Sequence, residues 1–202
     1  MKKNSIKLII FDGYGVILSR GYPDTCRALA EKFKLPEKEL LAIIYRKYFE
    51  LAAERKISQK AAWQLSVKYF NLPMSWQALR DLHLRLLKVN QPALNLAIKL
   101  NQRYKTLLLS KNTRTQFFET KKKFPKVWRS FDVTINVWEL GLPKASKQTI
   151  FVICKKFKVL PKEILYIDDQ KSNLIQPKKL GVKTIFYKNF FQFKKELNKY
   201  LS

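Results

Sequence analysis

Acidic residues are scarce in this sequence. Asp and Glu number 15 among 202 residues, against 41 Lys and Arg, which gives a formal net charge of +26. A surface this basic attracts nucleic acids or anionic membranes. The cations are mostly lysines spread along the chain, whereas proteins that read nucleic acids tend to concentrate arginine on one face. The charge therefore favours a solvated lysine-rich surface, and nucleic-acid binding is the less favoured interpretation.

Cysteine is almost absent, and long apolar runs are missing. The two cysteines, Cys26 and Cys154, fit neither a disulfide framework nor a zinc motif, which favours a reducing compartment. No apolar run reaches the roughly 18 residues that a membrane-spanning helix needs. Residues 1–5 are basic, but Asp12 and glycines follow and no small-residue cleavage site appears, which argues against a signal peptide. We expect a cytoplasmic protein without a membrane segment.

The sequence does contain enough apolar material for one well-buried core. Hydrophobic residues make up 47% of the chain and aromatic residues 13%, values that suit a globular protein and argue against disorder. A length of 202 residues fits one core domain with a small inserted subdomain.

A helical segment interrupts the chain after its first apolar run. Residues 6–11 are almost continuously apolar, which predicts a buried parallel strand. Helical spacing then predicts one helix over residues 23–34 and a second from Pro36 to about Arg55, and Ser58 and Ser75 are expected to cap a third and a fourth. None of these segments alternates like a strand. They predict a compact helical bundle inserted between the first and second strands.

The rest of the chain alternates between helices and strands. Predicted helices cover residues 93–102, 114–123, 146–158 and 172–180, and predicted strands cover residues 104–109, 131–135, 163–167 and 182–187. Such alternation with short connections is typical of a doubly wound parallel sheet. We therefore predict an α/β protein whose Rossmann-type core comprises residues 1–18 and 91–202. Residues 19–90 would form the inserted helical subdomain.

Three of the few acidic residues stand at the ends of predicted strands. Asp12 follows the first strand, and the pair Asp168–Asp169 follows the strand predicted over residues 163–167. In an open α/β sheet, ligands bind beyond the carboxyl ends of the strands. We therefore expect these carboxylates to meet in one site, although they lie far apart in the sequence. Their convergence points to a metal ion or an electrophile.

Four short motifs occur in a characteristic order. Asp12 follows the first strand, Ser110 follows the second, Lys144 ends the segment Glu-Leu-Gly-Leu-Pro-Lys, and Asp168–Asp169 comes after a later strand. Over nearly its whole length the chain resembles the haloacid dehalogenase (HAD) superfamily of hydrolases. Residues 107–187 are especially similar to its sugar-phosphate phosphatase branch, which includes the glucose-1-phosphate phosphatases and the N-terminal phosphatase domain of soluble epoxide hydrolases. The inserted bundle stands where many members carry a helical cap.

The resemblance implies a phosphomonoesterase that works through an aspartyl-phosphate. Asp12 would be the nucleophile, which splits ester hydrolysis into two displacements. The Ser110 hydroxyl would hold phosphate oxygens, and Lys144 would be a fixed cation in the transition state. The substrate would be a small phosphorylated metabolite such as a sugar phosphate.

The same resemblance implies a Mg²⁺ cofactor. Its ligands would be Asp12, the backbone carbonyl of Tyr14, and Asp168, Asp169 or both. Elementary electrostatics agrees, because three converging carboxylates repel one another and at least one tends to protonate when no metal is bound.

Position 14 departs from the phosphatase pattern. The phosphatases usually have a second Asp there, two residues after the nucleophile, as general acid and base, but this chain has Tyr14. A phenol is protonated at neutral pH and is a poor base for activating water. The 2-haloacid dehalogenases of the superfamily have an Asp-x-Tyr-Gly sequence like residues 12–15 and require no metal. Those dehalogenases typically lack paired carboxylates after the last motif strand. The presence of Asp168–Asp169 in this chain therefore favours the phosphatase.

Two alternatives stay open beside the phosphatase: a non-catalytic HAD-like binding protein and, less favoured, a metal-independent 2-haloacid dehalogenase. Lys111 stands where many relatives have Asn, and it either strengthens anion binding or points to solvent. Three aromatic residues of the inserted bundle either face the mouth of the site or belong to the core: Tyr45, Tyr48 and Phe49. His83 is interpreted as structural, because no second polar partner is evident in the sequence.

Overall fold

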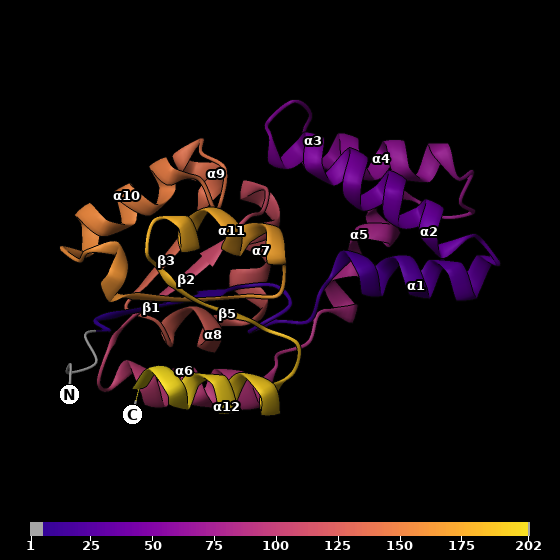
Figure 1. The fold of residues 1–202 in the computed structure, drawn as a ribbon. Coiled ribbons are helices and arrows are strands. Elements are labelled where there is room, and N and C mark those ends of the chain that lie inside the picture. Colours follow the sequence, from indigo (N-terminus) through magenta and orange to yellow (C-terminus); the bar gives the residue numbers. More distant parts are fainter. Residues whose placement is uncertain (1–5, 202) are drawn as a thin grey trace.

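The computed structural model describes residues 6–201. The basic residues 1–5, which entered the signal-peptide argument, lie outside the described residues. Within residues 6–201, no helix is both long enough and apolar enough to cross a membrane. The chain forms an α/β core and, beside it, a lobe made of helices alone (Figure 1).

Five parallel strands form the sheet of the core, in the order β3-β2-β1-β4-β5. They are β1 (Leu8–Asp12), β2 (Lys105–Ser110), β3 (Val133–Asn136), β4 (Ile164–Asp168) and β5 (Lys183–Phe186). The predicted parallel sheet is confirmed, with strand ends shifted by one or two residues. The register pairs Asp12 with Leu109 of β2 and Phe11 with Ile167 of β4, so the three central strands end side by side.

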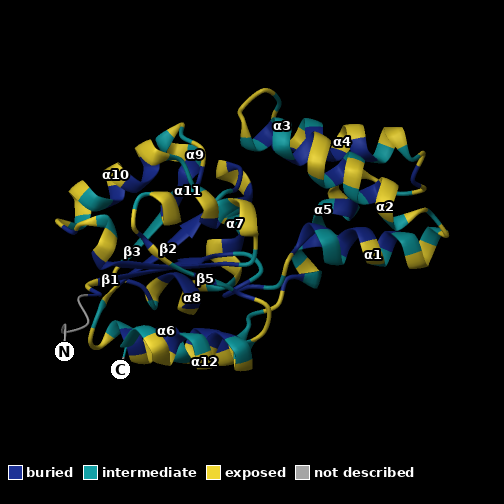
Figure 2. Cartoon of the chain, viewed as in Figure 1, coloured by how far each residue is buried: buried dark blue, intermediate teal, exposed yellow. Residues whose placement is uncertain are grey.

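Helices cover both faces of the sheet, as the doubly wound prediction requires (Figure 1). One face carries α6 (Gln91–Asn101), α8 (Pro125–Arg129) and α12 (Phe190–Leu201). The other face carries α9 (Val137–Leu140), α10 (Lys147–Phe157) and α11 (Lys171–Lys179), and α7 (Arg114–Lys123) follows β2. In β1, Ile9 and Phe11 pack toward the first face, and Leu8 and Ile10 toward the second. Burial on both sides explains why this strand is so continuously apolar (Figure 2).

Four elements of the core are missing from the sequence-based prediction: α8, α9, α12 and the short 3-10 helix Pro161–Glu163. The long α12 is the largest omission. Its residues Phe190, Phe193 and Leu197 recur at helical spacing, and Phe193 and Leu197 are buried in the core. This periodicity was therefore sufficient to predict the helix.

Residues 22–86 form the helical lobe. Its elements are α1 (Tyr22–Phe33), α2 (Glu37–Leu40), a π-helical segment (Leu41–Phe49), α3 (Glu50–Ala53), α4 (Gln59–Tyr69) and α5 (Trp76–Leu86). Ser58 and Ser75 accept hydrogen bonds from the backbone N–H groups of Ala61 and Ala78 at 3.0 and 3.1 Å, which confirms the predicted caps. The helix predicted from Pro36 is present, but its middle part is π-helical. The lobe has its own apolar core, which includes Trp63.

Candidate active site

Four charged side chains meet at the carboxyl ends of β1 and β4. Asp12 ends β1, Asp168 ends β4 and Asp169 follows it, and oxygens of the three carboxylates lie within 4.8 Å of one another. Lys144 reaches them from the loop between α9 and α10. Its Nζ atom lies 2.5 Å from Asp12 Oδ1 and 2.8 Å from Asp168 Oδ2. The structure thus brings together four residues that the sequence analysis singled out.

The charges of this group do not balance, because three carboxylates surround one ammonium. Asp12 is 3% exposed and Lys144 is 5% exposed. Burial raises the pKa of Asp12 well above its ordinary value, and the negative charge of Asp168 adds to the rise against the opposing effect of Lys144. Burial lowers the pKa of Lys144, but the charges of Asp12 and Asp168 outweigh it and raise that pKa. The surplus of buried negative charge suits an additional cation.

Asp168 is surrounded by hydrogen-bond donors. It accepts bonds from Lys144 Nζ, from the Tyr166 hydroxyl at 2.7 Å and from the backbone N–H of Gln170 at 2.8 Å. The Asn173 amide donates as well, with its nitrogen 3.1 Å from each carboxylate oxygen. Both oxygens of Asp168 are therefore engaged by protein groups, and this carboxylate fixes the position of the Lys144 ammonium.

Asp169 has different surroundings. Its Oδ1 atom is buried and has no hydrogen-bond partner within residues 6–201, and its Oδ2 lies 3.4 Å from Arg20 Nε. Gly15 has a φ of +92°, and a Cβ on it would lie 2.2 Å from Asp169 Oδ2, so the close approach of this carboxylate requires glycine. The Ser110 hydroxyl at the end of β2 is likewise buried without a partner in the described chain. Asp12 and Asp169 offer carboxylate oxygens, which are the ligands that Mg²⁺ prefers, and the Ser110 hydroxyl is free to donate a hydrogen bond to an anion.

A cavity of about 80 Å³ opens onto Asp12. The core contributes Lys144 and Lys111 to its wall, among other residues, and the helical lobe contributes Tyr22, Tyr45, Phe49 and Glu50. Because residues of the lobe form part of the wall over Asp12, we call the lobe (residues 22–86) the cap.

The Tyr14 phenol is engaged with α7. Its hydroxyl lies 2.7 Å from Thr120 Oγ1, and Thr120 donates its own proton to the Gln116 carbonyl at 2.7 Å. Tyr14 is therefore the donor in the pair with Thr120. Burial raises the pKa of this phenol to about 12. A hydroxyl with its proton so held does not replace the general acid and base of the phosphatase pattern.

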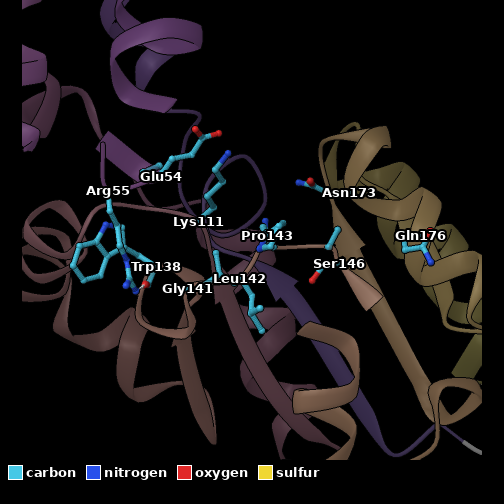
Figure 3. A pocket seen from close by; sticks show the side chains of 14 residues that line it. Glu54, Arg55, Lys111, Trp138, Gly141, Leu142, Pro143, Ser146, Asn173 and Gln176 are labelled. Carbon is cyan, nitrogen blue, oxygen red and sulfur yellow. Dashed lines mark hydrogen bonds between the residues drawn. The ribbon is translucent and has the colours of Figure 1, made fainter. Parts of the chain in front are cut away.

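Lys111, for which the sequence left two orientations open, forms an ion pair with Glu50 of the cap. A second cavity of about 580 Å³ adjoins the first, since Lys111 and Lys144 line both. Figure 3 shows Lys111 in the wall of this larger cavity, with Arg55 and Trp138. Arg55 of the cap bounds this larger cavity together with Trp138, and its guanidinium carbon lies 4.3 Å from the centre of the indole ring. Three basic residues, Arg55, Lys111 and Lys144, and the acidic Glu54 thus line the larger cavity.

His83 has two polar partners that the sequence did not make evident. Its fully buried ring lies 2.9 Å from Thr25 Oγ1 and 2.7 Å from Gln116 Nε2. Thr25 donates to the Gly21 carbonyl, so the histidine Nδ1 is a donor and its Nε2 accepts from the Gln116 amide. Burial lowers the pKa of His83 to about 3. A neutral histidine thus joins the cap to α7.

Two of the three aromatic residues of the π-helical segment occupy both predicted locations. Tyr45 and Phe49 line the Asp12 cavity and also pack in the apolar core of the cap, whereas Tyr48 packs near Ala52. The Tyr45 hydroxyl accepts a hydrogen bond from Gln170 Nε2 at 3.3 Å. Sequence reasoning missed several other residues of the site, because no local motif marks them: Arg20, Glu50, Gln116 and Tyr166.

A five-stranded parallel sheet with acidic residues at the ends of β1 and β4 and a helical cap after β1 is the haloacid dehalogenase-like fold. Among solved structures, a HAD family enzyme, BT-2542 of Bacteroides thetaiotaomicron, is 20% identical with a TM-score of 0.72, over 91% of this chain and 94% of that one. A predicted HAD-like hydrolase of Porphyromonas gingivalis is 18% identical with a TM-score of 0.71, over 96% and 98% of the two chains.

The L-2-haloacid dehalogenase of Xanthobacter autotrophicus is also similar, with 15% identity, a TM-score of 0.66 and coverage of 96% of this chain and 83% of that chain. At such identities the likeness concerns the fold. Comparison of the sequence with models of protein families and with curated proteins finds no match.

Proposed function

We propose that the protein is a Mg²⁺-dependent phosphomonoesterase that acts on a small phosphorylated metabolite. The observation that carries this proposal is the surplus of buried carboxylate around Asp12, together with the unsatisfied oxygens of Asp169 and Ser110. A divalent cation would balance the carboxylates, and a phosphate group would accept the Ser110 proton. BT-2542, which has the same fold, has been crystallised with magnesium and inorganic phosphate. That complex supports the same chemistry here.

Asp12 and Asp169 would hold the metal ion, together with the backbone carbonyl of Tyr14. The unsatisfied Oδ1 makes Asp169 the stronger candidate of the acidic pair, whereas Asp168 already orients Lys144. When bound, Mg²⁺ supplies positive charge that lowers the repulsion between a carboxylate nucleophile and a phosphate dianion.

The residues of the chain then have distinct tasks. An oxygen of Asp12 attacks phosphorus, the bond to the leaving oxygen breaks, and an aspartyl-phosphate forms. The Lys144 ammonium, held by Asp168, stays next to the attacking carboxylate and stabilises charge on the phosphoryl oxygens. The Ser110 hydroxyl donates to one of those oxygens. Water then attacks phosphorus, and its proton must pass to a base.

Hydrolysis of p-nitrophenyl phosphate by the purified protein, with Mg²⁺ or with EDTA, tests the proposal. We expect turnover that depends on the metal and that Asp12→Asn lowers by at least roughly 10³-fold, because the nucleophile is lost. Asp81→Asn, which removes a half-exposed aspartate from α5, should leave turnover unchanged. A folded protein that hydrolyses neither this ester nor a panel of phosphorylated metabolites would contradict the proposal and favour the binding protein.

A metal-independent 2-haloacid dehalogenase is the second candidate. It is favoured by Tyr14 in the Asp-Gly-Tyr-Gly sequence and by the structural likeness to an L-2-haloacid dehalogenase. Release of chloride from 2-chloropropionate in the presence of EDTA, abolished by Asp12→Asn, would establish it. Phosphate release that EDTA abolishes, with no chloride release, would exclude it.

A further inference from the structure

Hydrolysis of an aspartyl-phosphate requires a group that takes a proton from the attacking water. The side chain two residues after the nucleophile does not serve here, because the proton of the Tyr14 hydroxyl is held by Thr120. Lys144 is an ammonium bound by two carboxylates and has no lone pair to offer. The proton acceptor must come from elsewhere in the wall of the Asp12 cavity.

The phenols of the cap are poor acceptors. Tyr22 donates its hydroxyl proton to Gln116 Oε1 at 2.7 Å, and burial holds the pKa of Tyr22 well above its ordinary value. Burial likewise raises the pKa of Tyr45. The remaining carboxylate of the cavity wall, besides the nucleophile, is Glu50.

The π-helical segment of the cap directs Glu50 to the cavity. The backbone N–H of Glu50 bonds to the Tyr45 carbonyl five residues earlier, so the wider turn places residues four and five apart on one face. Tyr45, Phe49 and Glu50 all line the Asp12 cavity as a result.

Lys111 fixes this carboxylate over the site. Its ammonium forms an ion pair with Glu50, whose side chain is 32% exposed, and Lys111 itself adjoins Ser110 at the end of β2. The oxygens of this carboxylate have lone pairs that can accept a proton. The partial exposure gives water access to it. Glu50 thus combines position, charge and access to solvent.

We propose that Glu50, presented by the cap, is the general base of the second half-reaction. This inference rests on the proposed phosphatase function. A water oxygen attacks phosphorus of the aspartyl-phosphate while its proton passes to a Glu50 oxygen. The new phosphorus–oxygen bond replaces the bond to Asp12, whose electron pair returns to the Asp12 carboxylate. Glu50 then releases the proton to solvent.

Rapid-mixing kinetics with p-nitrophenyl phosphate and Mg²⁺ tests this role, because p-nitrophenolate leaves without needing a proton. Glu50→Gln should keep the burst of about one p-nitrophenolate per active site, with a rate constant close to that of the wild type. Its steady-state turnover should fall by roughly 100-fold or more, and the phosphorylated fraction of the enzyme should rise. Glu31→Gln, which removes an exposed carboxylate from α1, should behave as wild type.

Lys111→Gln separates proton transfer from a purely structural cap contact. If Glu50 only holds the cap in place, both variants should slow the burst and the turnover equally, without accumulation of phosphoenzyme, and the proposal is overturned. Turnover of Glu50→Gln within about threefold of the wild type would also overturn it. A wild-type burst without further turnover would refute the role of Glu50 as general base, but it would support the attack of Asp12 on a phosphate ester. Absence of both burst and turnover in the wild type would refute both proposals.

Discussion

Removal of the Lys144 ammonium should destabilise the metal-free protein strongly. Lys144→Met leaves three carboxylates, of which Asp12 and Asp168 are buried, without the cation that now lies 2.5 and 2.8 Å from those two. Breaking a buried ion pair by removing one partner costs about 3–5 kcal/mol of unfolding free energy. For a protein of this size, that cost lowers the melting temperature by about 6–20 °C.

The loss should also depend on pH in a defined direction. The pKa of Asp12 already lies above its ordinary value, and without Lys144 it rises further. The penalty is then complete at pH values above that raised pKa. It fades as the pH falls through the raised pKa, because the carboxylate protonates in the folded state. The difference between variant and wild type should therefore be larger at pH 8 than at pH 5.

Calorimetric melting in EDTA measures this difference, and Lys155→Met, an exposed lysine of α10, is the matched control. The control should melt within about 2 °C of the wild type, because exposed substitutions change stability by about 0.5 kcal/mol or less. A Lys144→Met protein that melts as the control does, or whose loss is the same at both pH values, would refute the charge imbalance that underlies the site.

Two further predictions concern Gly15 and His83. Gly15→Ala should cost about 1–3 kcal/mol of stability and weaken Mg²⁺ binding by about 10-fold or more, measured by titration calorimetry, because its Cβ would displace Asp169. Gly181→Ala is the control, because Gly181 has a similar φ of +89° and an added Cβ there would meet nothing within 4 Å. This control should lose stability but keep its affinity for Mg²⁺. Equal weakening of Mg²⁺ binding in both variants would contradict the reasoning. Since the pKa of His83 is lowered to about 3, wild-type stability should fall as the pH drops below about 6.5, where the unfolded chain takes up the proton first. Urea unfolding of His83→Gln should show a flatter dependence between pH 6 and pH 4, and an unchanged slope would exclude His83 as its source.

The fold could be predicted from the sequence to a large extent because its signals are local. Each buried strand is a short apolar run. Each serine cap stands directly before a helix, and its side chain accepts a hydrogen bond from the backbone N–H three residues later. The π-helical widening between Leu41 and Phe49 has no such signature, since its residues are those of an ordinary amphipathic helix. That segment was therefore predicted as continuous α-helix.

The candidate site likewise has a part that the sequence predicts and a part that it does not. The acidic residues at strand ends and the position of Lys144 follow from motifs along the chain, and the structure brings them together. The difference between Asp168 and Asp169 depends on donors such as Tyr166 and Asn173 that surround only one of them. Contacts between cap and core, such as the pair of Lys111 with Glu50, join distant positions that no spacing rule connects.

Chemical trapping of the phosphorylated residue tests the proposed chemistry most directly. The protein would be mixed with p-nitrophenyl phosphate and Mg²⁺, quenched during turnover and treated with borohydride, which reduces an acyl phosphate to an alcohol and so converts a phosphorylated aspartate to homoserine. Mass spectrometry of the peptides should find homoserine at position 12 when substrate and Mg²⁺ are both present, and aspartate when either is omitted. Turnover that proceeds with unmodified Asp12, or with the modification at another residue, would contradict the proposed mechanism.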